Sequence, residues 1–508
     1  MPPLLPRPPA RTFGEICVMR LPWAGPAPDP STPIEALAVD SRKVRPGTLF
    51  VAMPGVRLDG ASFAQYAVRQ GAVGVVCTPA GLEVAKGDIG DLPVPFFLHQ
   101  NPRAELARLA SAFHASQPEV IAAVTGTNGK TSTAHFLRQI WAYAGERAAA
   151  FGTTGVEGEG FDEPLSHTTP EPITLHALLA RLAEKGCSHA AMEASSHGLA
   201  QHRLDGVRLR AAALTNITRD HMDYHASHAD YVAAKLRLFG EVLPSDGVVV
   251  TNADDATLPQ VHEIAGARGL DLLTVGAGAE TDLRVHDQRF EPDGQSIALV
   301  WQGRFWPIRL PLIGAFQAEN VAIAAALALA TGIAAEEVFA ALPRLTGVKG
   351  RMEHVATRVN GAPVYVDYAH TPDALVSALR AIRPHVAGRL IVVGGAGGDR
   401  DPGKRPLMGR AMAEGADAVI VTDDNPRSED PALIRSAVME GCPEADNIGD
   451  RAEAILAGVD SLKSARDCLL IAGKGHEQGQ EVGGAVIPFD DGDQARAAVA
   501  VLDGELEL

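Results

Sequence analysis

The chain has 508 residues, 46% of them hydrophobic and 21% charged, and a formal net charge of −17. This composition is typical of a globular protein, and the excess of acid argues against a general nucleic-acid or membrane-surface role, which needs Lys and Arg. At about 100–200 residues per domain, the length predicts three domains, with two or four as alternatives.

The N-terminal part differs in pattern from the rest of the chain. The proline-rich start, MPPLLPRPPARTF, lacks an apolar segment of signal-peptide length, and ALAVDSRKVRPGTLFVAMPG then predicts short strands with turns. Near residues 342–355 an Ala-rich helix ends and a new series of strands begins. We therefore expect an N-terminal domain over residues 1–117, a central domain over 118–345 and a C-terminal domain over 346–508.

Short apolar runs that end in polar or glycine-rich residues recur along the chain. Continuous apolar runs indicate strands buried on both faces, and their alternation with helical stretches indicates parallel sheets, so we predict an α/β fold. Ligands bind beyond the carboxyl ends of parallel strands, and the polar ends therefore predict a site. The runs are IAAVTGTNGK, AAMEASSHG, AAALTNITRDH, GVVVTNADD, VYVDYAHTPD, LIVVGGAGGDRD, AVIVTDDNPR and LLIAGKGHE.

The segment IAAVTGTNGKTST predicts a strand, a phosphate-binding loop and a helix. The usual loop has four residues between its first glycine and the Gly-Lys pair, whereas here only two stand between them. Lys130 suits the β- and γ-phosphates and Thr131 suits Mg²⁺, and this Lys-Thr order disfavours a plain glycine turn. The predicted nucleotide-binding residues are Gly126, Thr127, Asn128, Gly129, Lys130, Thr131 and Ser132.

Five cysteines are far apart and include no Cys-x-x-Cys pair. This spacing argues against structural zinc and a disulfide framework, and it favours buried thiols in a reducing cytoplasm. The apolar segment that begins at Val321 is interrupted by Thr331 and Gly332, which favours a buried helix over a membrane crossing.

Motifs along nearly the whole chain resemble those of the Mur ligases of peptidoglycan synthesis, in the same order. The short Gly-x-x-Gly-Lys-Thr loop is that family's version, and it serves ATP-driven amide bond formation. The resemblance implies an N-terminal domain for the UDP end of the substrate, a central ATPase and a Rossmann-like C-terminal domain for the incoming amino acid. The motifs are DSR, GTNGKTS, MEASSHGL, NITRDHMDYH, YVAAK, QAENVAIA, GRME, VDYAHTPDAL, GGDRDPGKRPLMG and AGKGHE.

Within the family, the resemblance implies a ligase that uses ATP and Mg²⁺. It would add meso-2,6-diaminopimelate to UDP-N-acetylmuramoyl-L-alanyl-D-glutamate through an acyl phosphate. It implies small-molecule substrates, a cytoplasmic monomer, and neither nucleic acid nor membrane insertion. Addition of L-lysine and extension of folate by glutamate are alternatives, and the segment TDDNPR at 422–427 speaks against both.

A predicted metal site lies near Glu193, which ends an apolar run. Beside a phosphate loop, this carboxylate favours Mg²⁺ over a solvated acid. The acids and histidines of RDHMDYH would also suit a metallohydrolase, and a nucleotide-binding module without catalysis is a further alternative. The resemblance implies Glu193 and His221 as magnesium ligands, with Lys130 among the catalytic residues.

The segment SHADYVAAKLRLFGEV predicts a helix that Ser227 caps. On this helix Lys235 shares a face with Tyr231 and Phe239. Two interpretations stay open: a snorkelling lysine with its amine in water, or a desolvated amine that can add CO₂. The resemblance implies that Lys235 is carbamylated and that the carbamate helps to place a magnesium ion.

The resemblance also implies binding residues for the two nucleotide substrates. Ser41 would lie towards the uridine end, where this chain departs from close relatives at Val56, Arg57 and Leu58. The ATP contacts would include Asn320 near the adenine, with Arg351 and Asp367 from the C-terminal domain. The segments SHTTPEP and SSHGLAQHR supply the muramoyl dipeptide contacts, namely His167, Thr168, Thr169, Ser195, Gln201 and Arg203.

The segment TDDNPR is the family's motif for selecting the amino acid. Diaminopimelate ends in an ammonium and a carboxylate, and lysine lacks that carboxylate. A fixed Arg427 that pairs with the carboxylate would reject lysine by leaving a buried charge unpaired. The resemblance implies that Glu477 takes the distal ammonium. The predicted amino-acid-binding residues are Arg400, Asp424, Asn425, Pro426, Arg427, Gly473 and Glu477.

Overall fold

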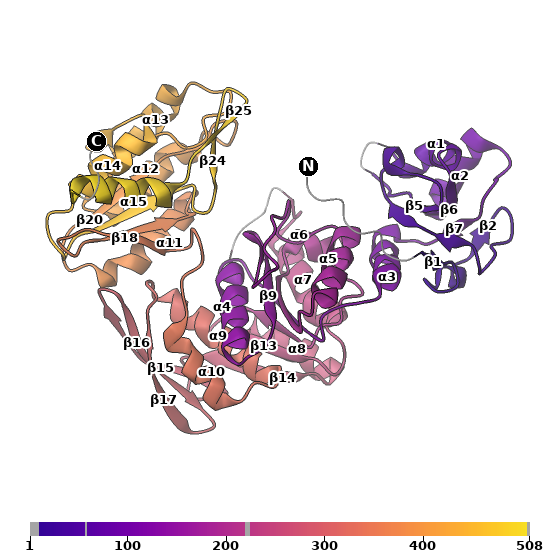
Figure 1. Ribbon diagram of the computed structural model, residues 1–508, viewed down its shortest axis with the longest axis horizontal. Coiled ribbons are helices and arrows are strands. Elements are labelled where there is room, and N and C mark those ends of the chain that lie inside the picture. The colour runs from indigo at the N-terminus through magenta and orange to yellow at the C-terminus, as the bar shows by residue number, and fades with distance from the viewer. Residues whose placement is uncertain (1–9, 56–57, 219–223, 505–508) are drawn as a thin grey trace. The chain divides into compact units, whose positions relative to one another are not determined.

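The structure is a computed structural model that describes residues 10–55, 58–218 and 224–504 (Figure 1). The chain divides into two compact units. The boundaries near residues 117 and 345 stay predictions. Unit 1 comprises Met1–Lys130, Gly145–Thr251 and Asp255–Leu272, and unit 2 comprises Thr131–Ala144, Asn252–Asp254 and Leu273–Leu508.

The N-terminal part of unit 1 is a five-stranded sheet in the order β2-β7-β6-β5-β4, parallel except for β2. Successive residues of a strand face opposite sides, so Leu49 joins the core cluster under α3 and Phe50 the cluster under α1 and α2. A short pair, β1 with β3, precedes it. The elements are β1 Arg11–Thr12, β2 Trp23–Ala24, β3 Pro33–Ile34, β4 Ala36–Ala38, β5 Thr48–Val51, α1 Ala64–Arg69, β6 Ala72–Cys77, α2 Pro79–Ile89, β7 Phe96–Leu98 and α3 Pro102–His114.

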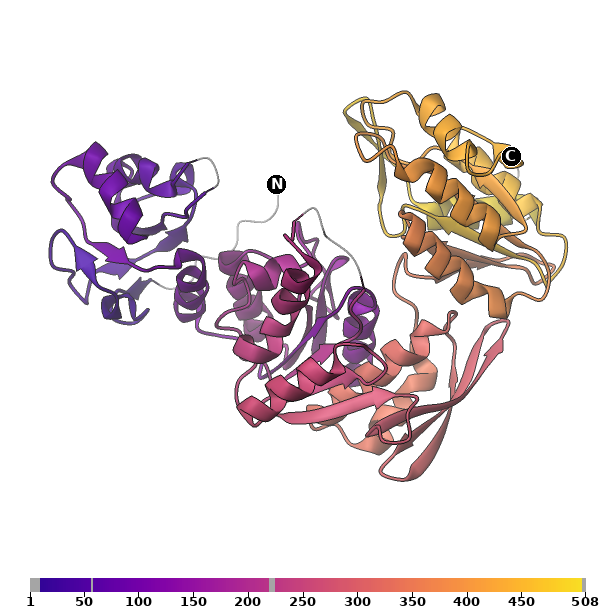
Figure 2. The same ribbon diagram turned by 180° about the vertical axis from the view of Figure 1, so that it is seen from behind.

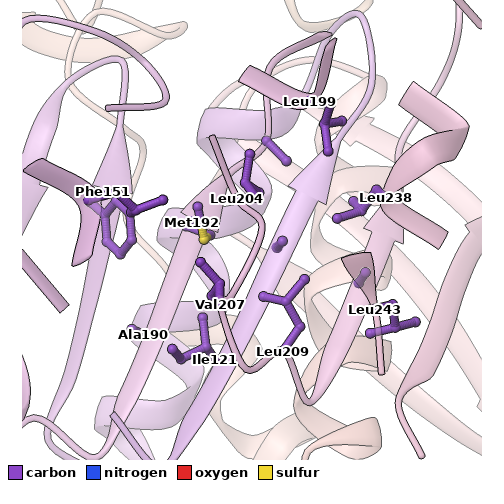
Figure 3. Packing of buried hydrophobic residues seen from close by; sticks show 14 of the residues in the cluster. Ile121, Phe151, Ala190, Met192, Leu199, Leu204, Val207, Leu209, Leu238 and Leu243 are labelled. Carbon is purple, nitrogen blue, oxygen red and sulfur yellow. The ribbon is translucent and has the colours of Figure 1, made fainter. Parts of the chain in front are cut away.

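Unit 1 also holds the strands β10-β9-β11-β8-β12-β13 of a ten-stranded sheet, in that order. All are parallel neighbours except β10, which runs antiparallel to β9. Figure 3 shows part of the core on one face, where Ile121 and Met192 of adjacent strands pack with Val207 and Leu209. The elements are β8 Val120–Thr125, β9 Ala148–Gly152, β10 Gly155–Glu157, α5 Pro172–Glu184, β11 His189–Glu193, α6 Ser196–Ala200, β12 Ala211–Leu214, α7 His228–Arg237, β13 Val248–Asn252 and α8 Leu258–Arg268.

In unit 2, strands β15, β16 and β17 form an antiparallel meander that both views show (Figures 1 and 2). Helix α9 is buried along most of its length, as predicted for the Ala-rich segment. Within the described ranges, no helix is both long and apolar enough to cross a membrane. The elements are α4 Lys130–Tyr143, β14 Asp271–Gly276, β15 Leu283–Glu291, β16 Gly294–Trp301, β17 Arg304–Leu310, α9 Phe316–Ala330 and α10 Ala335–Ala341.

The C-terminal part of unit 2 is a six-stranded sheet in the order β18-β19-β23-β20-β21-β22. Val392 packs in a cluster with α11, α12 and α13, while the next residue, Val393, packs with α14 and α15, so helices cover both faces. The elements are β18 Glu353–Thr357, β19 Pro363–Asp367, α11 Pro372–Ile382, β20 Leu390–Gly394, α12 Lys404–Gly415, β21 Ala418–Val421, α13 Pro431–Met439, β22 Asp446–Asn447, α14 Arg451–Asp460, β23 Cys468–Ala472, β24 Gly479–Val482, β25 Ala485–Pro488 and α15 Asp491–Leu502.

The predicted apolar runs are all strands. Four of them form the neighbouring parallel strands β11, β8, β12 and β13, and the other four form β19, β23, β20 and β21. Because strands within each set run parallel, their polar carboxyl ends lie along one edge of each sheet. The predicted α/β fold with mainly parallel sheets is confirmed.

Candidate active site

The phosphate loop follows β8 and is held by residues just after β12. Thr215 Oγ1 donates a hydrogen bond to the Asn128 carbonyl at 2.5 Å, and the Asn128 N–H donates to Asn216 Oδ1 at 3.1 Å. Gly126 has φ of +148°, and a Cβ there would lie 1.9 Å from Thr215 Oγ1. Glycine is therefore required where the shortened loop packs against β12. Thr131 and Ser132 are buried in the first turn of α4.

Two lysine amines converge on one carbonyl of this loop. Lys130 Nζ donates to the Gly126 and Thr127 carbonyls at 3.0 and 2.9 Å. Lys235 Nζ donates to the same Gly126 carbonyl at 2.6 Å and lies 4.6 Å from the centre of the Tyr231 ring. Lys235 is only 1% exposed, so its amine does not reach water and the snorkelling interpretation is disfavoured.

Helix α7, which carries Lys235, is attached to the loop and to the segment after β11. Ser227 caps the helix as predicted, accepting from the Asp230 N–H at 3.1 Å. Tyr231 Oη and Thr127 Oγ1 are hydrogen-bonded at 2.9 Å. At the other end, Arg237 Nη2 is 2.8 Å from both carboxylate oxygens of Asp205. These contacts fix the position of the lysine relative to the loop.

Glu193 ends β11 and is 1% exposed. Its Oε1 accepts from the Thr153 N–H at 2.7 Å, and Oε2 accepts from Thr153 Oγ1 at 3.3 Å. Within residues 10–55, 58–218 and 224–504, no group of three or more His, Cys, Asp or Glu side chains is suited to hold a metal ion. The predicted ligand His221 lies outside these ranges. A single buried carboxylate still fits Mg²⁺, which takes one or two carboxylates and fills its shell with water and phosphate oxygens.

The residues predicted to bind the muramoyl dipeptide meet beside Glu193. Arg203 Nη2 donates to Gln201 Oε1 at 2.8 Å, and Nη1 donates to the Thr169 carbonyl at 2.7 Å. Thr169 Oγ1 accepts from the Ser195 N–H at 3.0 Å and donates to the Glu193 carbonyl at 2.9 Å. One hydrogen-bonded network therefore contains four of the six predicted residues.

The remaining predicted residues of unit 1 lie apart from this network or at its margin. Thr168 Oγ1 is hydrogen-bonded at 3.1 Å to Thr153 Oγ1, which itself contacts the Glu193 carboxylate. His167 is exposed, and its one hydrogen bond among the described residues is with Ser166 Oγ, through Nδ1 at 3.1 Å. Ser41 is buried in the N-terminal sheet region, in the segment that precedes β5.

Unit 2 contains a cavity of about 330 Å³, which is lined by the segment Asn252–Asp254 and by β14, β15 and α9. Its lining includes Asn252, Asp254, Gln288 and Glu319. Burial raises the pKa of Glu319, and the nearby Asp254 carboxylate raises it further. Asn320, predicted near the adenine, follows Glu319 on α9 but is buried and donates to Gln317 Oε1 at 3.2 Å.

Arg351 and Asp367 lie close together at the start of the C-terminal sheet. Asp367 Oδ2 accepts from the Met352 N–H at 2.8 Å, and Oδ1 accepts from the Ala369 N–H at 2.9 Å. Burial raises the pKa of Asp367, while the Arg351 guanidinium opposes that rise. Arg351 stacks over the Tyr368 ring, with its guanidinium carbon 4.8 Å from the ring centre.

Asn425 organises the loop that follows β21. Its Nδ2 donates to Glu477 Oε2 at 2.9 Å, and its Oδ1 accepts from Lys474 Nζ at 2.9 Å and from the Glu481 N–H at 3.0 Å. Asn425 is 6% exposed and Lys474 is completely buried. The side-chain oxygen of Asn425 thus accepts two hydrogen bonds and its side-chain nitrogen donates one, all with residues from the segment between β23 and β24 or from β24 itself.

Arg427 is held in the left-handed region with φ of +53°. Its Nε donates to Glu481 Oε2 at 2.7 Å and its Nη1 donates to the Gly398 carbonyl at 2.8 Å. Gly473 has φ of +121°, and a Cβ there would lie 2.4 Å from Asp424 Oδ2. The predicted Asp424, Asn425, Arg427, Gly473 and Glu477 thus meet at one edge of the sheet, while Arg400 is exposed on the loop after β20.

Sequence comparisons identify the family of the chain. Three domain profiles match: the Mur ligase family catalytic domain at residues 33–141, the Mur ligase middle domain at 124–328 and the Mur ligase glutamate ligase domain at 350–475. The UDP-N-acetylmuramoyl-L-alanyl-D-glutamate–2,6-diaminopimelate ligase of Chelativorans sp. (strain BNC1) is 49% identical over 468 residues, which cover 92% of this chain and 95% of that protein. The chain belongs to the Mur ligase family.

Solved structures of Mur ligases share the fold. A structure of a UDP-N-acetylmuramoyl-L-alanyl-D-glutamate–2,6-diaminopimelate ligase superposes with a TM-score of 0.74 at 33% identity, covering 97% of this chain and 99% of that one. A MurF ligase from Thermotoga maritima, solved in complex with ADP, has the same fold with a TM-score of 0.59 at 17% identity, over 93% of this chain and 98% of that one. The family predicted from the motifs is therefore confirmed.

Several residues of this candidate site were missed by the sequence analysis. Thr153 follows β9 as the other polar residues follow their strands, and the run AAAFG before it carries the same signal that could have found it. Lys474 lies inside a recognised motif. Arg451 carried no signal: it is buried and pairs with Asp491 at 2.7 Å, and it donates to the Ala472 carbonyl at 3.0 Å. It also reaches the Asp423 carbonyl at 3.3 Å, so it connects the ends of β21 and β23.

Proposed function

We propose that this Mur ligase joins meso-2,6-diaminopimelate to UDP-N-acetylmuramoyl-L-alanyl-D-glutamate with the consumption of ATP. The observation that carries the proposal is the loop from Asp424 to Arg427, at the edge where the carboxyl ends of the C-terminal strands lie. Hydrogen bonds fix Arg427 there, and Glu477 and Glu481 lie beside the loop. The curated relative with this activity supports it, since it matches over nearly the whole chain.

The reaction needs no protein nucleophile. A carboxylate oxygen of the D-glutamate residue attacks the γ-phosphorus of ATP, so a P–O bond forms, the bond to the leaving oxygen breaks, and acyl phosphate and ADP result. The neutral amine of diaminopimelate then attacks the acyl carbon, phosphate leaves, and the amine loses a proton to give the amide. Catalysis is mainly positioning and neutralisation of charge.

The residues of the phosphate loop supply the positive groups. Lys130 would exchange its two loop carbonyls for phosphate oxygens, and the start of α4 offers N–H groups and the positive end of the helix dipole. Mg²⁺, when bound, would neutralise phosphate charge. Its proposed ligands are Thr131, Glu193, His221 and Lys235 as a carbamate, together with water and phosphate oxygens.

The two other substrates would bind beyond the strand ends. Thr168, Thr169, Ser195, Gln201 and Arg203 would hold the dipeptide, so that its terminal carboxylate lies near Glu193. For ATP we propose Asn320, Arg351 and Asp367, with the cavity beside Glu319 as a site of suitable size for the base. Arg427 would bind the distal carboxylate of diaminopimelate, and Arg400, Gly473 and Glu477 would complete that site.

The proposal is tested by supplying the purified protein with ATP, Mg²⁺ and the UDP-muramoyl dipeptide, and adding meso-diaminopimelate or L-lysine in parallel. Product is detected by mass. We expect a tripeptide product only with diaminopimelate. Product only with lysine would keep the ligase activity and overturn the role of Arg427, and intact ATP with both amino acids would overturn the ligase itself.

A further inference from the structure

His202 stands in a strained backbone conformation between two residues predicted to bind the dipeptide. Its φ is +58°, in the left-handed region, which costs a residue other than glycine energy unless contacts hold it. Its neighbours Gln201 and Arg203 are joined to each other by hydrogen bonds of 2.8 and 3.2 Å. The two hydrogen bonds of the His202 ring among the described residues instead reach Asn101 and Asp205.

These two partners define which ring nitrogen of His202 carries the hydrogen. Asp205 Oδ2 lies 3.0 Å from Nδ1. Burial would raise the pKa of Asp205, but hydrogen bonds from His202 and Arg237 outweigh that effect and lower it, so the carboxylate is ionised and can only accept. Asn101 Nδ2 lies 3.0 Å from Nε2 and donates, because Oδ1 of the same amide accepts two backbone N–H groups at the start of α3. The ring is therefore neutral, with its hydrogen on Nδ1, and it joins both partners.

Asn101 belongs to a helix that is anchored in the N-terminal part of unit 1. It is the N-cap of α3, whose Leu106 packs in a core cluster of the N-terminal sheet. Farther along α3, Ser111 Oγ donates to the Gly206 carbonyl at 2.8 Å. Two points of α3 therefore hold the segment that contains His202 and Gly206.

On its other side, His202 supports the residue that anchors α7. Asp205 accepts from Arg237 Nη2 through both oxygens at 2.8 Å, and each of these two side chains is 12% exposed. Arg237 Nη1 also donates to the Leu199 carbonyl at 3.0 Å. Lys235, whose amine donates to the phosphate loop, precedes Arg237 by two residues on the same helix. A rotation of the Asp205 carboxylate would therefore release the end of α7 that carries Lys235.

We propose that His202 is a positioning residue for the ligase reaction. Its backbone sets the places of Gln201 and Arg203, which hold the dipeptide. Its ring fixes this segment to α3 on one side and, through Asp205, to α7 on the other. The dipeptide and Lys235 are thereby aligned before the carboxylate attacks, and such alignment contributes to the rate. This inference rests on the proposed function and deepens it.

The test replaces His202 with glycine, which adopts the left-handed conformation without strain, so only the side chain is lost. We expect the Kd for the UDP-muramoyl dipeptide, measured by calorimetry, and its KM to rise about tenfold, as for two lost hydrogen bonds. The kcat should fall about tenfold through poorer alignment, and the KM for diaminopimelate should not change. Added imidazole should restore part of the affinity and of kcat, since the His202 side chain is 23% exposed and its place can be reached from solvent.

A second variant tests the same contact from its other partner. Asn101→Ser keeps a good N-cap for α3, but the serine hydroxyl is too short to reach His202. Dipeptide binding should weaken, and the double variant should bind no more weakly than His202→Gly, since both changes break one contact. Gln302→Gly is the matched control, because Gln302 is exposed in the turn between β16 and β17 with φ of +49°. It should change none of these constants.

Unchanged dipeptide affinity in both His202→Gly and Asn101→Ser would overturn the inference. A lower kcat with normal affinity and no response to imidazole would show that His202 only stabilises the fold, and would overturn it as well. Calorimetry needs no turnover, so it separates this inference from the proposed function: dipeptide binding that depends on His202, without ligation by the unmodified protein, would refute the proposed function alone.

Discussion

Replacement of Lys235 tests the centre of the proposed mechanism. A carbamate forms when a neutral amine adds CO₂ and loses a proton, leaving one N–H and a new carboxylate. That remaining N–H could keep the hydrogen bond that Lys235 Nζ now donates to the Gly126 carbonyl at 2.6 Å. The new negative charge would then be available to a magnesium ion without loss of the contact between α7 and the phosphate loop.

We expect Lys235→Ala to lower kcat by about 100- to 1,000-fold, the range found when one preorganised electrostatic group is removed from a site. Lys235→Arg should be comparably inactive, because a guanidinium keeps the positive charge and forms no carbamate. Loss of the hydrogen bond to the Gly126 carbonyl should also lower the free energy of unfolding, by about 0.5–1.5 kcal/mol in Lys235→Ala.

The assay is phosphate release with all three substrates, with and without added acetate or formate, alongside a thermal unfolding curve. Short carboxylates should restore part of the activity of Lys235→Ala. Lys185→Ala is the matched control, since Lys185 Nζ also donates to a glycine carbonyl, that of Gly160 at 3.4 Å, but is exposed. A fully active Lys235→Ala would refute the carbamate, and an inactive variant that no carboxylate rescues would indicate that the lysine only holds the loop.

Three further predictions concern specificity, metal and pH. Arg427→Ala should raise the KM for diaminopimelate about 10- to 100-fold and leave the KM for ATP unchanged. Arg304→Ala is the control, and equal changes in the two KM values of Arg427→Ala would indicate that Arg427 has only a structural role. Removal of Mg²⁺ with a chelator should abolish turnover and its return should restore it, and turnover in its absence would contradict the proposed ligands. Burial lowers the pKa of His176 to about 4, from an unfolded value near 6.5. The neutral imidazole therefore contributes fully to stability above pH 6.5, and this contribution is lost as the pH falls towards 4. Urea midpoints should reveal a loss of about 2 kcal/mol at pH 5 that is smaller in His176→Gln; an equal loss in the variant would assign the acid sensitivity to other groups.

The fold, and the edge of each sheet at which the polar strand ends gather, were predictable because they depend on local patterns. A continuous apolar run such as LIVVGG can only be buried on both faces, and its first polar residue marks the carboxyl end. The start of the helix capped by Ser227 was predictable for the same reason, because Ser227 and its partner Asp230 are only three residues apart in the sequence.

What the sequence could not predict depends on contacts between distant residues. Nothing near Glu481 in the chain indicates that its partner is Arg427, 54 residues away, or that Arg451 is buried against Asp491, 40 residues away. Likewise, the sequence placed Lys235 on an apolar stripe but did not show which carbonyl its amine reaches. These pairings follow from how strands and hairpin meet in space rather than from any local pattern.

The C-terminal sheet separates the residues that make it stable from the residues that we propose select the amino acid. Its core consists of strand and helix side chains such as Val392, Leu470 and Ile391, whereas the residues proposed to bind the amino acid stand on loops after the strands. A substitution in those loops can change the preferred amino acid without opening a cavity in the core. One scaffold can thus acquire new substrates over evolution, while changes that weaken its interior are removed because they unfold every variant alike.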